Sequence, residues 1–418
     1  MAAVTDTILE VQFVSMKKEN IPRPLYMQQL IDFKDKDIIK VVTGIRRSGK
    51  STLLEMFAEY LKEHGVKEEQ IIFINFESAK FEYIRDGKEL YEHIKNNISQ
   101  NGRTYVFLDE IQAVKDFESS VNSITVDFDT DVYLTGSNAY MLSSDLSTLL
   151  SGRHVEIMMY PFSFKEYMSA QSSGRSPEDC LYDYMKYGGF PFLVNEKKEK
   201  NIGTYLDGIY NTVVFKDIIQ RNRVKDPAFI EKLIRFIFSS MGCIVSPSSI
   251  SKAMRNEGRS VTNETIDNYL EMLCKAYVLS KTVRYDIKGK EYLKTLNKYY
   301  VTDLGLRNHI MGYRQTEVTH ALENIIYFEL LRRGYKVDIG KIDSAEVEFI
   351  ARNENEIKYY QVAWTVSGRP ETLEREYRPF DMIPDHYEKA LITMDKDPFD
   401  SLNGVKRINA IDFLLSDP

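Results

Sequence analysis

A glycine-rich stretch near the N-terminus has the residue types and the spacing that bind phosphate. Residues 41–54 read VVTGIRRSGKSTLL, and residues 44–51 fit the pattern GxxxxGK[ST] at every fixed position. The glycines let backbone N–H groups approach phosphate oxygens, and the N-terminus of the following helix adds a positive field. We expect Lys50 to neutralise the β- and γ-phosphates and Ser51 to hold Mg²⁺. The predicted nucleotide-binding residues of this loop are Gly44, Ile45, Arg46, Arg47, Ser48, Gly49, Lys50, Ser51 and Thr52.

Two carboxylates follow a hydrophobic strand farther along the chain. Residues 105–110 read YVFLDE. In a phosphate-loop fold, Asp109 would hold Mg²⁺ through water and Glu110 would polarise the attacking water. A strand that ends in Asp-Glu is a weak signal by itself, but its position after a phosphate loop makes it specific. The pair predicts ATP hydrolysis rather than ATP binding alone.

Further polar residues stand where a nucleotide could meet them. The next predicted strand ends in TGSN, so Ser137 or Asn138 is expected to sense the γ-phosphate, as sensor residues of AAA+ ATPases do; the alternative is a role in the turn. Arg153 precedes the fifth strand, where AAA+ proteins place the arginine finger that enters a neighbour's nucleotide site. The alternative for Arg153 is a surface position or a pair within its own subunit. The finger predicts a homo-oligomer, and one arginine does not distinguish a hexamer from a dimer.

These residues lie where predicted strands and helices alternate. Strands are predicted at 37–44, 71–78, 104–110, 131–137 and 154–162, and a helix at 51–65. Such alternation is typical of βαβ units in a parallel sheet, and nearly all-apolar strands are expected where both faces of the sheet are covered. We therefore predict an α/β fold of the P-loop NTPase type, followed by a mostly helical stretch over 163–225 with a break at YGGFPFL.

The pattern changes after residue 226. Amphipathic helices are predicted in FIEKLIRFIFSSMG, SPSSISKAMRNEG and TNETIDNYLEMLCKAYVL, with Ser246 and Thr262 as N-caps. VRYDIKGKEYLKTLNKYYV is predicted to be a hairpin around Lys288-Gly289. Three short helices and a hairpin are the pattern of a winged helix-turn-helix. From about 313 we predict a helix that ends in Gly334 and strands in YKVDIG, EVEFIAR, IKYYQVAWTV and KALITM.

The winged-helix region is basic within an acidic chain. The chain has a net charge of −7 and a pI of about 5.6, whereas residues 226–300 hold 12 lysines and arginines against 8 aspartates and glutamates. Such a module can bind DNA phosphates. The candidate DNA contacts are Lys252, Arg255, Arg259, Lys281, Arg284, Lys288 and Lys290, with Lys294 and Lys298 farther along the hairpin. Glu264, Asp267 and Glu271 on the third helix would repel DNA, so the alternative is a protein-interaction or lid domain.

Six short motifs together resemble a prokaryotic AAA-type ATPase family with a C-terminal domain of unknown function. They are GIRRSGKS, LDEIQ, LTGSN, LSGR, YPFSFKEY and YGGFP, and the segments VTDLGLRNHIMG and ALENIIYFELLRRGY resemble the start of the C-terminal domain. The resemblance covers nearly the whole chain. It implies an AAA+ core near the signalling, STAND-like branch, a winged helix, and a C-terminal domain of restriction-endonuclease-like fold. It also implies that Pro191, in the GxP element of that branch, packs near the adenine.

The C-terminal region retains only part of a PD-(D/E)XK nuclease site. Such nucleases need a helix glutamate, a strand acid, and (E/Q)xK on the next strand, which together hold Mg²⁺ and activate water. Glu323 or Glu329 could be the helix acid, and EVE at 346–348 offers the strand acid. QVA at 361–363 fills the third element with Ala363 in place of lysine. We therefore predict a nuclease-like fold that does not cut; alternatively, the two strand glutamates are simply exposed charges.

The predicted domains are an AAA+ ATPase core over 1–165, a helical lid over 166–225, a winged helix over 226–312 and a PD-(D/E)XK-like domain over 313–418. The expected ligands are ATP and Mg²⁺. The leading hypothesis is an oligomeric ATPase that binds DNA, branched DNA included, and remodels or translocates it. The alternatives are a STAND-like nucleotide-dependent switch that binds a protein partner, and an ATP-dependent nuclease, against which Ala363 argues.

Composition supports a globular protein. The chain is 43% hydrophobic and 28% charged. No signal peptide is recognisable, and no apolar run approaches the length of about 18 residues that a membrane helix needs, so we expect a cytoplasmic protein with no membrane partner. Cys180, Cys243 and Cys274 lie far apart in the sequence, which predicts buried free thiols rather than a zinc site.

Overall fold

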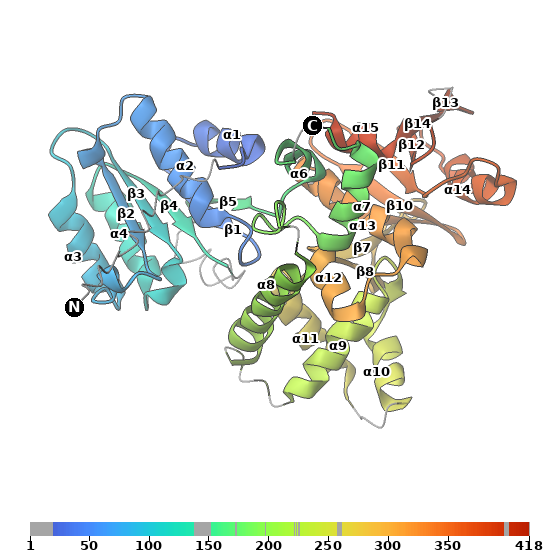
Figure 1. Ribbon diagram of the computed structural model, residues 1–418, viewed down its shortest axis with the longest axis horizontal. Helices are drawn as coiled ribbons and strands as arrows, with labels where there is room; N and C mark the ends of the chain where they lie inside the picture. The colour runs from blue at the N-terminus through green and yellow to red at the C-terminus, as the bar shows by residue number, and fades with distance from the viewer. Residues whose placement is uncertain are drawn as a thin grey trace, which may run out of the picture.

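The computed structural model describes residues 20–137, 152–171, 174–196, 198–220, 222, 224, 226–256, 261–396 and 401–417. Two sheets organise these residues (Figure 1). The first sheet has five strands in the order β2-β3-β4-β1-β5, and every neighbouring pair is parallel. Its strands are β1 (Ile39–Thr43), β2 (Ile71–Asn75), β3 (Thr104–Asp109), β4 (Thr130–Thr135) and β5 (His154–Met158). The predicted parallel sheet and its five strands are therefore confirmed.

Helices cover both faces of this sheet. They are α1 (Pro24–Asp32), α2 (Lys50–Glu63), α3 (Gly87–Asn97) and α4 (Phe117–Asp127). Adjacent residues of β1 show the alternation, since Val42 packs with α1 and α2 whereas Val41 packs with α3 and α4. Both valines are fully buried. This double coverage explains why the strands read as continuous apolar runs.

A helical region connects the two sheets. It contains α6 (Phe164–Ser169), α7 (Pro177–Tyr187) and α8 (Glu199–Asn211), and α8 continues into a π-helical segment, Thr212–Gln220. Next come α9 (Pro227–Ser239), β6 (Ile244–Val245), α10 (Pro247–Asn256) and α11 (Asn263–Lys275). Ser246 and Thr262 accept backbone N–H bonds at the starts of α10 and α11, as predicted.

The second sheet joins the predicted hairpin to the C-terminal strands. Its nine strands follow the order β13-β14-β12-β11-β10-β9-β7-β8-β6. They are β7 (Leu279–Asp286), β8 (Glu291–Val301), β9 (Lys336–Ile342), β10 (Ala345–Arg352), β11 (Ile357–Val362), β12 (Glu388–Thr393), β13 (Ser401–Leu402) and β14 (Val405–Asn409), together with β6. The helices α12 (Leu304–Met311), α13 (Val318–Arg332), α14 (Pro370–Met382) and α15 (Ala410–Leu415) complete this region.

The hairpin is not a separate wing, because β7 pairs in parallel with β9 of the C-terminal region. One hydrophobic core contains Ile45 together with residues between Phe162 and Leu414, and it includes side chains of α7, α9, α11 and α13. The division at residues 225 and 312 stays a prediction, and both boundaries fall within that one core. The elements α14, β13, β14 and α15 were not anticipated.

Two other features concern the predictions about membrane helices and about the cysteines. Within the described part of the chain, none of the helices combines the length and the apolar character needed to cross a membrane. Cys180 is buried, as expected, whereas Cys274 is half-buried and Cys243 is exposed. Cys243 lies in the turn between α9 and β6, where the backbone reaches the surface, so the prediction of a buried thiol is wrong for this residue.

Candidate active site

The phosphate loop follows β1 and ends at the N-terminus of α2, as its pattern predicts. Gly44 has a φ of +136°, and a Cβ atom there would lie 2.0 Å from the carbonyl oxygen of Met159. Gly49 has a φ of +99° and precedes the first residue of α2. Neither conformation suits a residue with a side chain. The two fixed glycines are thus required by the path of the backbone.

Lys50 is buried at the centre of the loop. Its Nζ donates to the carbonyl oxygens of Gly44 at 3.0 Å and Ile45 at 3.1 Å. Burial lowers the pKa of Lys50 to about 8, and the charge of Glu110 opposes that shift in part. The ammonium group is therefore held by the loop's own oxygens at the position expected to receive phosphate.

Asp109 stands at the end of β3 with hydroxyl and amide donors around it. The Oγ of Ser51 donates to Oδ1 at 3.0 Å, the Oγ1 of Thr135 donates to the same oxygen at 2.5 Å, and the Nδ2 of Asn75 donates to Oδ2 at 2.9 Å. Burial raises the pKa of Asp109, and the hydrogen bonds from Thr135 and Ser51 counteract the shift. A hydroxyl beside a carboxylate is the oxygen donor set that Mg²⁺ prefers. Ser51 and Asp109 therefore fit the cation predicted for them.

Glu110 has a left-handed backbone conformation, with a φ of +56°. Its N–H donates to the Oγ1 of Thr135 at 2.8 Å. The Oγ of Ser137 lies 3.3 Å from its Oε2, to which the Nε2 of Gln112 also donates. Strained backbone of this kind persists where surrounding contacts hold it, often at functional sites. The predicted Ser137 thus lies at the Glu110 carboxylate, whereas Asn138 lies outside the described residues.

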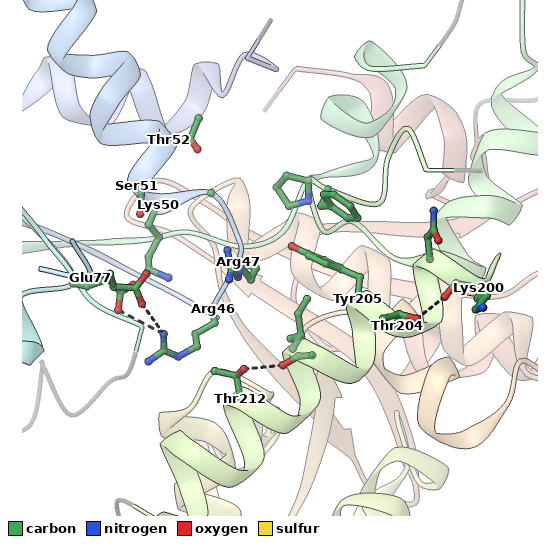
Figure 2. A pocket seen from close by; sticks show the side chains of 17 residues that line it. Arg46, Arg47, Lys50, Ser51, Thr52, Glu77, Lys200, Thr204, Tyr205 and Thr212 are labelled. Carbon is green, nitrogen blue, oxygen red and sulfur yellow. Dashed lines mark hydrogen bonds and ion pairs between the residues drawn. The ribbon is translucent and has the colours of Figure 1, made fainter. Parts of the chain in front are cut away.

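The phosphate loop forms one side of a cavity of about 1000 Å³, and α8 forms the other side (Figure 2). Pro191 lines the cavity, and its place beside a bound base stays a prediction. Phe192 and Tyr205 stack with ring centroids 4.4 Å apart. Gly208, one turn after Thr204 on α8, also lines the cavity, and a Cβ atom there would meet nothing within 4 Å. The cavity therefore combines a phosphate-binding end with an aromatic end.

Several residues at this site were not identified from the sequence. Thr135 and Gln112 belong to the motifs LTGSN and LDEIQ, and these motifs could have identified them as site residues. Asn75, Tyr205 and Gly208 belong to no recognised motif, and only the fold brings them to the loop.

Arg23 forms hydrogen bonds with the phosphate loop and with neighbouring elements. Its Nε donates to Oε1 of Glu166 at 2.7 Å, and its two terminal nitrogens donate to the carbonyl oxygens of Ser48 at 3.1 Å and Tyr160 at 2.8 Å. Its side chain is 3% exposed. Since Ser48 belongs to the loop and Glu166 to α6, Arg23 joins the phosphate loop to the helical region.

Arg153 lies just before β5, and its carbonyl oxygen accepts the N–H of Ile39 at 2.9 Å. Its side chain is exposed and is not among the described residues that line the cavity. This position is compatible with the predicted finger for a neighbouring subunit, and that role stays a prediction.

The predicted DNA contacts have different environments. Lys252, Arg255, Lys281, Lys288 and Lys290 are exposed, Arg284 is half-buried, and Arg259 lies outside the described residues. The expectation that Lys298 faces phosphates is wrong, because β8 lies inside the nine-stranded sheet and buries that side chain. The exposed face of α11 carries Glu264, Asp267 and Glu271. This region therefore exposes both cations and carboxylates.

Lys298 lies among the acids of the suspected nuclease relic. Its Nζ is 3.1 Å from Oε1 of Glu323 and 2.7 Å from Oε1 of Glu346. Burial disfavours charge on Glu323, but Lys298 holds the pKa of that carboxyl below its usual value. Burial and the nearby Glu323 raise the pKa of Glu348 well above its usual value. Among the described residues, no group of three His, Cys, Asp or Glu side chains is arranged to hold a metal ion.

Glu329, the other candidate for the helix acid, does not belong to the cluster formed by Lys298, Glu323 and Glu346. Glu329 pairs instead with Arg333, the residue that follows α13, at 3.0 Å. The alternative that both strand glutamates are simply exposed charges is wrong, because both are half-buried: Glu348 accepts the N–H of Val362, and Glu346 pairs with Lys298. Ala363 is buried, as its apolar side chain requires.

Comparisons with known proteins agree with this site. Residues 36–168 match the AAA domain family, and residues 178–317 match a family described as a domain of unknown function. The second match spans both the predicted lid and the predicted winged helix. Two solved structures are among those that a structural search matches to this chain. The Walker-type ATPase of Pyrococcus abyssi is 17% identical, covering 70% of this chain and 97% of that one, with a TM-score of 0.49. The Orc1 protein of Aeropyrum pernix, solved in complex with DNA, is 13% identical, covering 70% and 92%, with a TM-score of 0.30.

Full-length relatives give the family. An uncharacterized protein of Methanocaldococcus jannaschii is 27% identical over 388 residues, which cover 87% of this chain and 84% of that protein. An uncharacterized protein of Haemophilus influenzae is 42% identical over 404 residues, which cover 96% of this chain and 100% of that protein. The chain belongs to the same family as the Haemophilus influenzae protein, and its N-terminal part is an AAA-type P-loop ATPase domain.

Proposed function

We propose that this protein hydrolyses ATP in the cavity between the phosphate loop and α8. The observation that carries the proposal is the arrangement around Thr135, whose hydroxyl group bonds both Asp109 and the backbone of Glu110. Asp109 and Ser51 would hold Mg²⁺, which supplies positive charge to the phosphates when bound. The adenine would lie at the aromatic end, beside Pro191 and the Phe192–Tyr205 stack.

In this proposal, the side chains have separate tasks. Lys50 leaves the loop carbonyls and binds β- and γ-phosphate oxygens. Glu110 accepts a proton from the attacking water, and Ser137 and Gln112 fix the orientation of its carboxylate. Arg153 of a neighbouring subunit stabilises the charge that develops on the γ-phosphate. A Lys50→Ala protein that hydrolyses ATP at the normal rate would refute this assignment.

We further propose that the active form is an oligomer that binds DNA and remodels or translocates it. The exposed cations of residues 252–290 support phosphate binding. The test is the rate of ATP hydrolysis with single-stranded DNA, duplex DNA and a four-way junction at fixed salt, with Lys50→Ala as the control. Strong stimulation by one form would support a DNA motor and identify its substrate. No change with any form would contradict it.

A second candidate function is a nucleotide-dependent switch that binds a protein partner, as in STAND-like ATPases. The observation that favours it is the acidic exposed face of α11, where a DNA-reading helix would instead avoid acidic side chains. This function predicts slow turnover, tight retention of ADP and a hydrolysis rate that DNA does not change. The same hydrolysis assay therefore distinguishes the two candidates.

For the C-terminal region we propose an endonuclease-like fold without cleavage activity. Support comes from Ala363 and from Lys298, whose ammonium group already pairs with both Glu323 and Glu346. We expect no cutting of plasmid DNA with Mg²⁺ or Mn²⁺. Metal-dependent cutting that disappears in Glu348→Ala would overturn this proposal.

A further inference from the structure

The side chain of Arg46 extends from the phosphate loop to the segment that follows α8. Its Nε donates to Oδ2 of Asp217 at 2.6 Å, and its NH2 group donates to Oδ1 at 3.1 Å. Asp217 belongs to the π-helical segment Thr212–Gln220. This two-point contact joins the loop expected to bind phosphate to the chain segment that leads into α9.

Two further carboxylates lie near the same guanidinium group. Its NH1 is 3.6 Å from Oε1 of Glu77 and 3.9 Å from Oε2 of Glu110, as the dashed lines in Figure 2 mark. The side chains of Arg46, Glu110 and Asp217 are 16%, 12% and 7% exposed, so these three charges interact with little screening by water, whereas Glu77 is exposed and its contribution is screened. Burial would lower the pKa of Arg46, but the hydrogen bond to Asp217 and the three negative charges raise it. Arg46 is therefore the positive centre of a strongly acidic corner of the cavity.

A bound nucleoside triphosphate would change the balance of charges around the Arg46 guanidinium group. Its γ-phosphate would lie between Lys50 and Glu110, within the group of side chains that Arg46 already faces. A phosphate oxygen is a strong partner for a guanidinium group and competes with a carboxylate. Asp217 is 6% exposed, so losing Arg46 would leave a buried charge without its counter-ion. The segment that carries Asp217 would then have to move.

We propose that Arg46 binds the γ-phosphate of ATP within its own subunit and thereby releases the segment Thr212–Gln220, which Asp217 joins to the phosphate loop in this structure. This inference rests on the proposed function of the cavity. ADP has no γ-phosphate and leaves the Arg46–Asp217 contact in place. The response to ATP is thus a movement of the segment Thr212–Gln220, which leads into α9. This response is the same whether the protein acts on DNA or on a protein partner.

The test compares affinities for Mg²⁺-ADP and for the non-hydrolysable analogue in which an imido group bridges the β- and γ-phosphates. We expect Arg46→Gln to weaken analogue binding by about tenfold to a hundredfold, the effect of losing a charged hydrogen bond, and to change ADP binding little. Asp217→Asn should strengthen analogue binding in the wild-type background and have no such effect in Arg46→Gln. The matched control is Arg47→Gln, which removes a charge from the same loop and should weaken both ligands equally.

A second measurement reads the segment directly. Backbone hydrogen exchange over residues 212–220 should increase with the analogue, not with ADP, and should already be high without nucleotide in Asp217→Asn. Equal losses of ADP and analogue affinity in Arg46→Gln, or exchange that ADP and the analogue change alike, would overturn the inference. If the wild-type protein binds neither nucleotide, the proposed function fails instead. Circular dichroism of each variant checks that the fold is retained.

Discussion

Replacing Arg23 by methionine should destabilise the AAA domain by about 3 to 5 kcal/mol, the usual cost of removing one partner from a buried ion pair. The side chains of Arg23 and Glu166 are 3% and 10% exposed, so water does little to screen the charge left on Glu166. The carbonyl oxygens of Ser48 and Tyr160 also lose a donor, which places the expected value near the upper end. Methionine retains the apolar body of the side chain and limits the loss of packing.

Urea unfolding followed by circular dichroism measures the free energy of unfolding. The companion variant is Glu166→Gln, which removes the charge but keeps an oxygen for the N–H of Ser163 in the cap of α6. The double variant should be more stable than the sum of the single effects predicts, by about 2 kcal/mol, because the uncompensated charge is gone. Nucleotide affinity should fall together with stability in Arg23→Met, since the same side chain holds Ser48.

Two results would refute this reasoning. An Arg23→Met protein that unfolds within about 1 kcal/mol of the wild type would mean that the buried pair contributes nothing net, as some buried pairs do. Strictly additive effects in the double variant would mean that Arg23 and Glu166 do not interact energetically, whatever their distance.

Three further predictions concern the cavity. Because the pKa of Lys50 is lowered to about 8 and phosphate binds the protonated amine, nucleotide affinity should be constant below that pH and fall about tenfold per unit above it. Lys50→Arg should remove this dependence, and calorimetric titrations between pH 7 and 10 would show it. Thr135→Val should lower kcat by about ten- to a hundredfold with nucleotide affinity nearly unchanged, because the hydroxyl positions Asp109 and Glu110 for hydrolysis; steady-state ATPase kinetics beside equilibrium binding would separate the two effects. Gly208→Leu should raise the melting temperature, because leucine has a higher helix propensity than glycine by about 1 kcal/mol. The same change should weaken ADP binding and leave the affinity for tripolyphosphate unchanged, because the new side chain would extend into the cavity. An ADP affinity equal to that of the wild type would show that the base lies elsewhere.

Local patterns in the sequence were enough for the phosphate end of the site. The spacing from Gly44 to Ser51 depends on a turn of a few residues, and Asp109 and Glu110 end an apolar strand. Both signals lie within single short segments, and the structure brings the two segments together at the carboxyl edge of the parallel sheet, where Ser51 bonds Asp109. The alternation of largely apolar strands with helices also predicted that sheet, because a strand covered on both faces is mostly apolar; Lys40 and Asp131 are exceptions that pair with each other inside the sheet.

Other features depended on chain segments that meet only in the folded protein. Asp217 meets Arg46 across 171 positions of sequence, Arg23 meets Glu166 across 143, and Lys298 lies beside Glu323 because β8 pairs within a sheet whose order no local pattern records. An isolated charge in a polar segment gives no sign of its eventual partner. Short-range patterns in the sequence by themselves therefore determined the parallel sheet and the phosphate loop. Only the tertiary structure decided which buried charges pair and which residues of α8 close the cavity, because those contacts exist only after distant segments are packed together.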